Sequence, residues 1–211
     1  MLFDFETLPG AERYKLLVST VVPRPVAWVV TQDGAGLVNA APYSFFNAFS
    51  SNPAIVGIGC GPRPEGTAKD TLANIKATGQ FVVCLVPHAL VEQMNVTATE
   101  FGPEVNEIAE AGLTQASSSK VKPPRIAESP VAMECETFQL VPAGEHTIVL
   151  GKVLAMHVRD DAVMDPVKHY IDTPKLDLVG RMHGRGWYTR TTDRIEVPRI
   201  SLKDWEARKK G

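Results

Sequence analysis

The strand-like segments of this chain follow one another with few helical segments between them. Residues 24–31 ("RPVAWVVT") are rich in β-formers, and 54–59 ("AIVGIG") and 81–86 ("FVVCLV") are continuous apolar runs of strand length. Residues 131–141 and 146–158 alternate apolar and polar positions and are joined by the turn "PAGE", which predicts a long hairpin. Because strictly alternating strands and helices are typical of parallel sheets, this order favours a mainly β fold, a closed antiparallel barrel.

Helical signals are short and lie between or outside these strands. Residues 9–20 have Pro near the start and apolar side chains on one face, and 67–79 have helical spacing and a closing Gly79. Two further short helices are expected within 90–100 and 104–112. The loop "QDGAG" after residue 31 predicts a hairpin with "LVNAAPYS". About six strands with short peripheral α-helices result.

The length and composition suit one globular domain spanning residues 1–211. The chain has 211 residues, of which 44% are hydrophobic and 22% charged. Within that domain, the Ser- and Pro-rich segment 117–130 is expected to be a surface excursion without regular structure, and 201–211 a C-terminal tail. A net charge of −2 gives no reason to expect nucleic acid or an anionic membrane as a partner, since either would need a basic face. Small molecules are therefore the expected partners.

Cysteines, histidines and the N-terminus exclude several classes of protein. Cys60, Cys84 and Cys135 are widely spaced within apolar runs, which predicts reduced core thiols rather than a disulfide framework. The five histidines have no ligand spacing, so no metal site is expected. The first residues lack a basic start and apolar block, and no apolar run approaches the roughly 18 residues of a membrane span. We therefore expect a cytoplasmic protein.

A loop that runs into a predicted helix offers a phosphate site without a known nucleotide motif. The segment 61–71 ("GPRPEGTAKDT") combines Gly and Pro with Arg63, Thr67 and Lys69, and it leads into a helix at Asp70 and Thr71. Free backbone N–H groups, the helix dipole and a lysine suit a phosphate. The alternative is that Thr67 or Asp70 only caps the helix and Lys69 is solvated.

The stretch 39–59 ("NAAPYSFFNAFSSNPAIVGIG") is uncharged over 21 residues and mixes aromatics with amides and hydroxyls. It could be a core strand with its turn, in which the phenylalanines pack, but its Ser and Asn side chains would then need partners. Beside the cationic loop, an aromatic and amide-rich segment suits a flat amphiphilic ring attached to a phosphate. Flavin mononucleotide (FMN) is such a molecule. Haem or a pyridoxal phosphate is disfavoured, since the segment 39–52 has no His and no Lys.

Several ordered motifs resemble one known family. The order R-P-V, N-x-A-P-Y-S-F-F-N and K-D-T-x-x-N-I, followed by "EHTIVLGKV" (145–153) and "GRMHGRGWY" (180–188), is similar to the flavin reductase-like, FMN-binding split-barrel family that includes flavoredoxin. The match spans about residues 20–190. Glu145 stands where many relatives have Asp before the histidine. The resemblance implies an antiparallel split β-barrel, usually a homodimer with flavin near the subunit interface.

The resemblance also implies which residues would bind FMN. One set would line the isoalloxazine ring and the ribityl chain: Tyr43, Ser44, Phe45, Phe46, Asn47, Ser50, Ser51 and Asn52. A second set would lie around the phosphate: Thr67, Lys69, Asp70 and Thr71. His146 falls on a strand near the cofactor and is the catalytic candidate, although a strand histidine bonded across the barrel is the alternative. Arg181, His183 or Tyr188 could face the flavin or a second subunit, and an ordinary Gly-rich turn explains them equally well.

Two functions remain open from the sequence. The first is an NAD(P)H-dependent flavin reductase, in which NADH or NADPH reduces FMN and the electrons pass to free flavin or a small oxidant. The second is a non-enzymatic FMN electron carrier reduced by another protein. The flavin itself carries the hydride chemistry, so the protein has to bind the ring, leave one face open and stabilise charge on it. Exposed strand edges and the aromatics of 43–49 and 187–188 further favour a homodimer.

Overall fold

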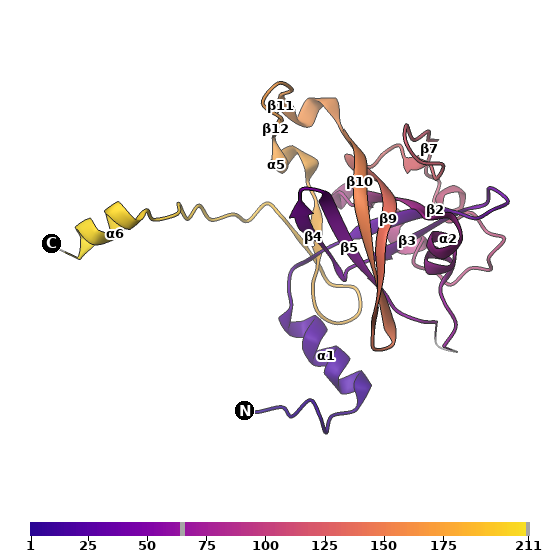
Figure 1. Ribbon diagram of the computed structural model, residues 1–211, viewed down its shortest axis with the longest axis horizontal. Coiled ribbons are helices and arrows are strands. Elements are labelled where there is room, and N and C mark those ends of the chain that lie inside the picture. The colour runs from indigo at the N-terminus through magenta and orange to yellow at the C-terminus, as the bar shows by residue number, and fades with distance from the viewer. Residues whose placement is uncertain (64–65, 210–211) are drawn as a thin grey trace.

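The centre of the molecule is a seven-stranded antiparallel sheet (Figure 1). The computed structural model describes residues 1–63 and 66–209. The strand order in this sheet is β3-β2-β6-β9-β10-β5-β4, and a second, three-stranded sheet has the order β1-β13-β14. The strands are β1 Arg24–Pro25, β2 Ala27–Gln32, β3 Val38–Tyr43, β4 Phe46–Ser51, β5 Ala54–Cys60, β6 Gln80–Leu85, β7 Gln115–Ala116, β8 Arg125–Ile126, β9 Val131–Ala143, β10 His146–Val158, β11 Val163–Asp165, β12 Tyr170–Ile171, β13 Val179–Arg181 and β14 Tyr188–Arg190. The helices are α1 Gly10–Thr20, α2 Asp70–Thr78, α3 Val91–Val96, α4 Glu107–Glu110, α5 Thr173–Leu176 and α6 Leu202–Arg208, with 3₁₀ turns at His88–Leu90 and Asp160–Ala162.

Both predicted hairpins are confirmed. β2 pairs with β3, with Ala27 opposite Tyr43, and the two 13-residue strands β9 and β10 pair along their whole length. The sheet has seven strands where about six were predicted, because β4 is a separate edge strand paired to β5. α1 and α2 are confirmed, and Gly79 ends α2 with a φ of 70°. The predicted mainly β, antiparallel class is therefore confirmed.

The sheet has apolar side chains on both faces, as a curled sheet covered by helices requires. On the inner face, Val29, Ile58 and Phe81 pack with Leu72 and Ile75 of α2. On the opposite face, Trp28, Val30 and Val82 pack under the segment that contains α3 and α4. β3 and β5 also contact each other, although they are not neighbours in the strand order. α2 thus packs on the inner face of the sheet, near the place where β3 and β5 approach each other.

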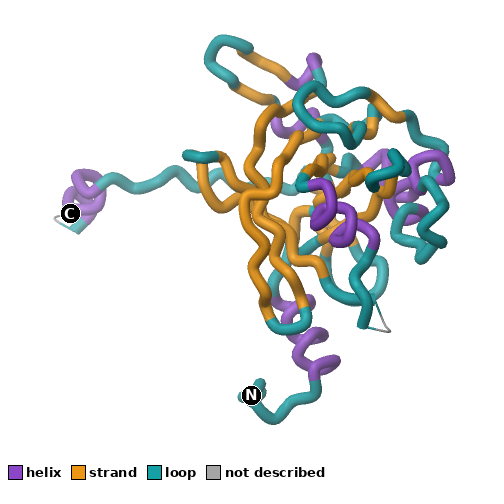
Figure 2. The backbone as a smooth tube through the Cα atoms, turned by 45° about the vertical axis from the view of Figure 1, so that its right-hand side comes forward, coloured by secondary structure: helices purple, strands orange, loops and turns teal. Residues whose placement is uncertain are grey.

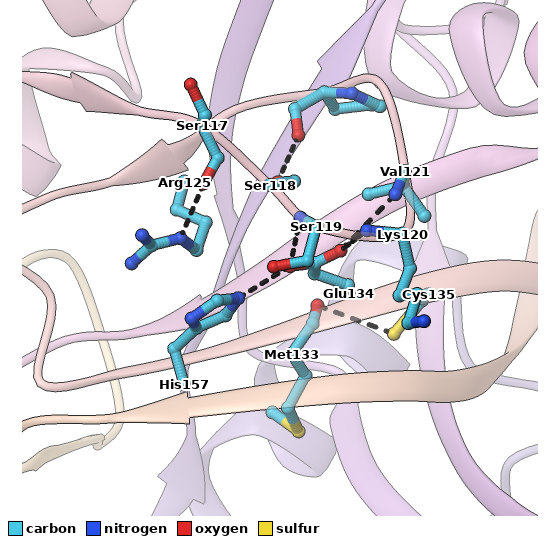
Figure 3. Close-up of polar contacts among 11 residues, drawn as sticks. Ser117, Ser118, Ser119, Lys120, Val121, Arg125, Met133, Glu134, Cys135 and His157 are labelled. Atoms are coloured by element: carbon cyan, nitrogen blue, oxygen red, sulfur yellow. Dashed lines mark hydrogen bonds and ion pairs between the residues drawn. The ribbon is translucent and has the colours of Figure 1, made fainter.

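The segment 117–130 differs from its prediction. It was expected to be a surface excursion without regular structure, but Arg125–Ile126 forms β8, and Val121 and Ile126 are buried. The reason is Glu134, which is fully buried on β9 and accepts hydrogen bonds from the backbone N–H groups of Ser119 (2.8 Å) and Lys120 (2.5 Å) (Figure 3). A buried carboxylate needs such donors, and they hold this segment against the sheet.

A further donor to Glu134 is the imidazole of His157, whose Nε2 lies 2.5 Å from the carboxylate (Figure 3). Burial opposes ionisation of Glu134, but the hydrogen bonds from His157, Ser119 and Lys120 prevail and hold its pKa at about 2. The carboxylate is therefore ionised at neutral pH in spite of its burial.

The cysteine prediction is confirmed: Cys60, Cys84 and Cys135 are buried free thiols. Burial raises their pKa values to about 12, 11 and 12, so the thiolate forms that would react are scarce at neutral pH. Within residues 1–63 and 66–209, no helix is long and apolar enough to cross a membrane. The same ranges contain no cluster of three or more His, Cys, Asp or Glu side chains that could hold a metal ion.

Candidate functional site

A pocket of about 150 Å³ opens at the N-terminus of α2. Its walls come from β3, the loop before α2, the start of α2, the segment after α3 and the first residue of α4. The lining residues are Asn39, Ala41, Pro42, Tyr43, Arg63, Lys69, Asp70, Thr71, Thr97, Ala98, Thr99, Glu100, Phe101 and Glu107. Four of the predicted cofactor residues, Tyr43, Lys69, Asp70 and Thr71, therefore lie around one cavity.

The N-terminus of α2 presents backbone donors to this pocket. Lys69 is the N-cap residue, and its side chain makes no capping hydrogen bond. The first backbone bond of the helix runs from Ala73 N–H to the Lys69 carbonyl (3.0 Å). The three preceding N–H groups have no hydrogen-bond acceptor among the described residues. Such a helix end attracts an anion through its free donors and its dipole.

The described residues of the loop before α2 set the charges at the pocket. Arg63 N–H donates to the Thr67 carbonyl (2.8 Å), which brings the exposed Thr67 beside the start of the helix. The Arg63 guanidinium pairs with Asp70 at 2.5 Å. In the described part of the chain, Lys69 forms no ion pair, so its ammonium is the cation left for an anionic ligand, while Arg63 neutralises the carboxylate of Asp70.

A chain of hydrogen bonds runs from α2 to α4 along the pocket wall. The Thr71 hydroxyl donates to Asn39 Oδ1 (2.9 Å), and Asn39 Nδ2 donates to Glu107 Oε1 (2.6 Å). The Ala40 N–H donates to the other Glu107 oxygen (3.0 Å). Burial, with a smaller effect of Asp70, raises the pKa of Glu107 against these donors. Because the hydroxyl proton of Thr71 is already engaged, Thr71 offers a ligand its backbone N–H.

The hydroxyl of Tyr43 is the least satisfied polar group at the pocket. It is buried, and no described residue meets hydrogen-bond geometry with it. Burial raises its pKa, and the nearby hydroxyl of Thr71 offsets the rise in part. Tyr43 is thus a neutral phenol that can donate to a ligand. Plain packing of the ring would leave that donor unexplained.

A second group of predicted residues lies next to the pocket. The imidazole of His146 stacks on the ring of Phe45, with 5.8 Å between centroids and 27° between planes. The same imidazole lies over Gly61, two residues before Arg63 of the pocket. Phe45 is likewise two residues beyond Tyr43. The stack and the pocket therefore adjoin one another at the ends of β3 and β5.

The remaining predicted residues lie along β4 or its ends and do not line the pocket. Phe46 is half-buried against the inner core, while Asn47, Ser50, Ser51 and Asn52 are exposed on the edge strand. Two of them make local bonds: Asn47 Oδ1 accepts from Ala48 N–H (2.8 Å), and Ser50 Oγ accepts from Asn52 N–H (3.2 Å).

Ser44 is held by a buried arginine that joins three segments. Arg24 Nε donates to Ser44 Oγ (3.3 Å), and its Nη atoms donate to the carbonyls of Val18 (2.8 Å), Val21 (2.7 Å) and Met182 (3.0 Å). The end of α1 and the loop 182–187 are therefore tied to the predicted cofactor segment. Burial lowers the pKa of Arg24, and the three carbonyl oxygens compensate for its desolvation.

The residues whose role the sequence left open lie in the loop 182–187 or at the strand ends that flank it. The Arg181 guanidinium lies 4.7 Å from the centroid of the Tyr188 ring, and His183 stacks on Trp187 with 6.1 Å between centroids and 11° between planes. Arg181 and His183 therefore each pack against an aromatic ring in or beside this loop. Arg24 connects the loop to Ser44, since it bonds both Met182 and Ser44.

Sequence reasoning missed one wall of the pocket, residues 97–101, and the residue that holds Asn39 in place, Glu107. Residues 97–101 follow α3 and carry no recognisable motif. Asn39 and Glu107 are 68 positions apart, and their contact depends on how the chain packs α4 against β3. For Asn39, the available signal was its place in the uncharged stretch, where a buried amide needs partners.

Comparison with known proteins agrees with the fold. Residues 18–173 match the flavin reductase like domain. This chain belongs to that family. An uncharacterised protein of Deinococcus radiodurans is 45% identical over 218 residues, covering 99% of this chain and 96% of its own.

Solved structures with flavin reductase-like folds superpose on nearly the whole chain. Nitrilotriacetate monooxygenase component B from Bacillus cereus has a TM-score of 0.87 at 28% identity and covers 93% of this chain and 98% of its own. The 2-nitrobenzoate 2-nitroreductase NbaA of Pseudomonas fluorescens has a TM-score of 0.86 at 30% identity, with 96% and 98% covered. A split-barrel protein from Shewanella frigidimarina has a TM-score of 0.80 at 23% identity, with 95% and 100% covered. The expected split β-barrel is therefore confirmed.

Proposed function

We propose that this protein binds FMN and catalyses hydride transfer from NADH or NADPH to the flavin. The observation that carries the proposal is a combination at one pocket: the helix N–H groups at the start of α2, the ammonium of Lys69 and the unsatisfied buried hydroxyl of Tyr43. The first two suit a phosphate dianion, and the third suits a polar atom of the attached chain or ring. Membership of the flavin reductase like family supports a flavin as the ligand.

When it is bound, FMN supplies hydride and electron transfer. The residues of this chain would divide the remaining work. Lys69 and the N–H groups at the start of α2 would hold the phosphate, with Thr67, Asp70 and Thr71 around it. The segment from Tyr43 to Asn52 would lie along the ring and the ribityl chain, and His146, stacked on Phe45 beside the pocket, would support the reacting ring.

The electrons would leave to a small oxidant or to free flavin. The names of two structurally similar proteins, a monooxygenase component and a nitroreductase, support acceptors of this kind. We also propose that the working unit is a homodimer, since Phe45 and Phe49 lie exposed on the edge of the main sheet.

Two titrations and one reduction test the proposal. The apo-protein is titrated with FMN and with riboflavin, and the loaded protein is then mixed with NADH or NADPH without oxygen while the flavin absorbance is followed. The expected result is much tighter binding of FMN than of riboflavin, followed by bleaching. Equal affinities for FMN and riboflavin would rule out the proposed phosphate site. Tight FMN binding without bleaching by either nucleotide would instead indicate a non-enzymatic electron carrier.

A further inference from the structure

The chain ends in an arm that leaves its own barrel. Residues 192–209, called here the C-terminal arm, run away from both sheets and end in α6 (Figures 1 and 2). Every residue of the arm is exposed. Within the described part of the molecule its hydrogen bonds are internal, such as that from Trp205 N–H to the Ser201 carbonyl (2.9 Å). The arm therefore has no packing surface of its own subunit beneath it there.

The composition of the arm is not that of a solvated tail. Five large apolar side chains are exposed on it: Ile195, Val197, Ile200, Leu202 and Trp205. Ile195 and Val197 are 87% and 79% exposed. A helix as short as the seven-residue α6 is marginal by itself, because isolated helices need about 12–15 residues in water. Both features indicate an arm that packs on another surface.

The root of the arm is fixed to its own domain. The Arg190 guanidinium makes bonds of 3.0 and 3.1 Å to both carboxylate oxygens of Asp177. The Thr191 hydroxyl donates to the Leu178 carbonyl (3.1 Å). These contacts tie the chain to the start of β13, from which residues 192–209 run away from the barrel (Figure 1).

An open apolar surface lies close to this root. Phe45 and Phe49 lie over Gly59 and Gly57 of β5, and Leu150 of β10 borders Gly57 on the same side. These five residues define the outer face of the sheet. Phe49 is 64% exposed, and β4, the last strand of the sheet, has an open edge and no charged residue. Edges of this kind are normally covered or charged in proteins that stay monomeric.

We propose that the C-terminal arm of each copy packs on the outer face of a second copy, and that two copies exchange arms reciprocally. β1 contacts β4 and belongs to the same small sheet as β14, so the arm starts beside the outer face. Two copies that meet at this face place each arm over the other subunit, and a two-fold arrangement closes the assembly. The 18 residues of the arm alone approach the roughly 20–30 residues per side of a stable interface.

The charges of the arm favour a protein surface over other occupants. Between residues 192 and 209 the sequence has four acidic and five basic side chains in mixed order. An anionic membrane or a nucleic acid would require a basic face. The five residues of the outer face carry no charge, so they suit the apolar side chains of the arm. The inference rests on the homodimer proposed above.

Sedimentation of full-length variants tests the exchange. The wild type is expected to sediment at twice 23.0 kDa at micromolar concentration. The double variant Leu202→Asp/Trp205→Asp is expected to dissociate at concentrations at least about tenfold higher than the wild type. The control Met164→Asp/Val167→Asp alters two exposed apolar residues of the β11–β12 hairpin and is expected to change nothing. A monomeric wild type, or an arm variant that associates like the wild type, overturns the proposal.

A disulfide experiment identifies the receiving surface. Phe49→Cys and Trp205→Cys are combined in one full-length chain and oxidised, which is feasible because the three natural cysteines are buried. Exchange predicts a reducible species at twice the chain mass, whereas a bond within one chain, or no bond, overturns the assignment. FMN titration of the wild-type dimer keeps the two proposals separate: a dimer that binds no FMN would contradict the cofactor and leave the arm exchange standing.

Discussion

His146 rests on Gly61, and a side chain at position 61 would collide with it. A Cβ atom there would lie 2.9 Å from His146 Nε2, closer than side chains approach one another. The same imidazole stacks on Phe45, so one ring is fixed between a glycine and an aromatic residue. This contact places an imidazole beside the candidate pocket with its orientation set by packing.

His146→Ala is expected to slow anaerobic flavin reduction by NAD(P)H about tenfold or more, equivalent to at least about 1.4 kcal/mol. FMN affinity should change less than about threefold, because the α2 N-terminus and Lys69 would carry most of the binding. Stopped-flow bleaching and an FMN titration measure both quantities. His169→Ala, on the exposed β11–β12 turn, is the control. An unchanged bleaching rate would make His146 a structural residue of β10.

Lys69→Ala is expected to weaken FMN binding by about 1.5–3 kcal/mol, the range for a hydrogen bond to a charged group. Riboflavin, which lacks the phosphate, should bind as it does to the wild type. Lys76→Ala removes a lysine from the other end of α2 and serves as the control, with no expected effect on either ligand. If Lys69→Ala reduced both affinities equally, its effect would be on folding and not on the phosphate.

Thr71→Val removes the hydroxyl of Thr71 and keeps its backbone N–H. The hydroxyl donates to Asn39 Oδ1, so its loss should lower the free energy of unfolding by about 1–2 kcal/mol. FMN affinity should change less than about threefold, since the N–H remains. Urea unfolding and an FMN titration test both statements, with Thr78→Val in the last turn of α2 as the control. A large loss of FMN affinity in a stable protein would mean that the hydroxyl reaches the phosphate.

The parts of the fold that were predicted correctly depend on local periodicity. The β2–β3 and β9–β10 hairpins and α2 each have a pattern long enough to read, and Gly79 ends α2 as its position indicated. β1, β13 and β14 have only two or three residues each, too few for any period. The Arg24 guanidinium supports this small sheet through hydrogen bonds to the carbonyls of Val18 and Met182. No local signal reveals contacts between such distant segments.

Three alternating glycines in and just after β5 carry a further signal of the site. A glycine inside an apolar strand indicates a close approach by another group, and Gly57, Gly59 and Gly61 alternate along one side of the chain. They accommodate Phe49, Phe45 and His146 in turn. This spacing relates two predicted site residues to each other.

The burial of Glu134, by contrast, has no local signal. Glu134 stands in an alternating strand, where a charged residue is expected to face solvent. Its burial depends on N–H donors supplied by Ser119 and Lys120 of a Ser- and Pro-rich segment. Because those donors come from a segment whose own sequence predicts no regular structure, only the folded chain reveals the pairing.

Glu134 makes stability depend on pH over a defined range. Its pKa in the folded protein is about 2, against an ordinary value of 4.5. A carboxyl group with a depressed pKa stabilises the fold fully above its unfolded value and loses that contribution as the pH falls toward the folded value. The contribution of Glu134 should therefore be complete above about pH 4.5 and fade between there and about pH 2.

Glu134→Gln is expected to lower the free energy of unfolding by about 2–3 kcal/mol at pH 7, because an amide cannot replace a carboxylate that accepts from His157 and two backbone N–H groups. The difference from the wild type should shrink steadily below about pH 4.5. Urea unfolding at about pH 7 and about pH 3 measures it. Glu136→Gln, on the same strand in a half-exposed pair with Lys152, should cost less than about 1 kcal/mol at both pH values. A Glu134→Gln deficit that stays constant down to about pH 3 would show that shape and packing, rather than the charge of this carboxylate, hold segment 117–130 in place.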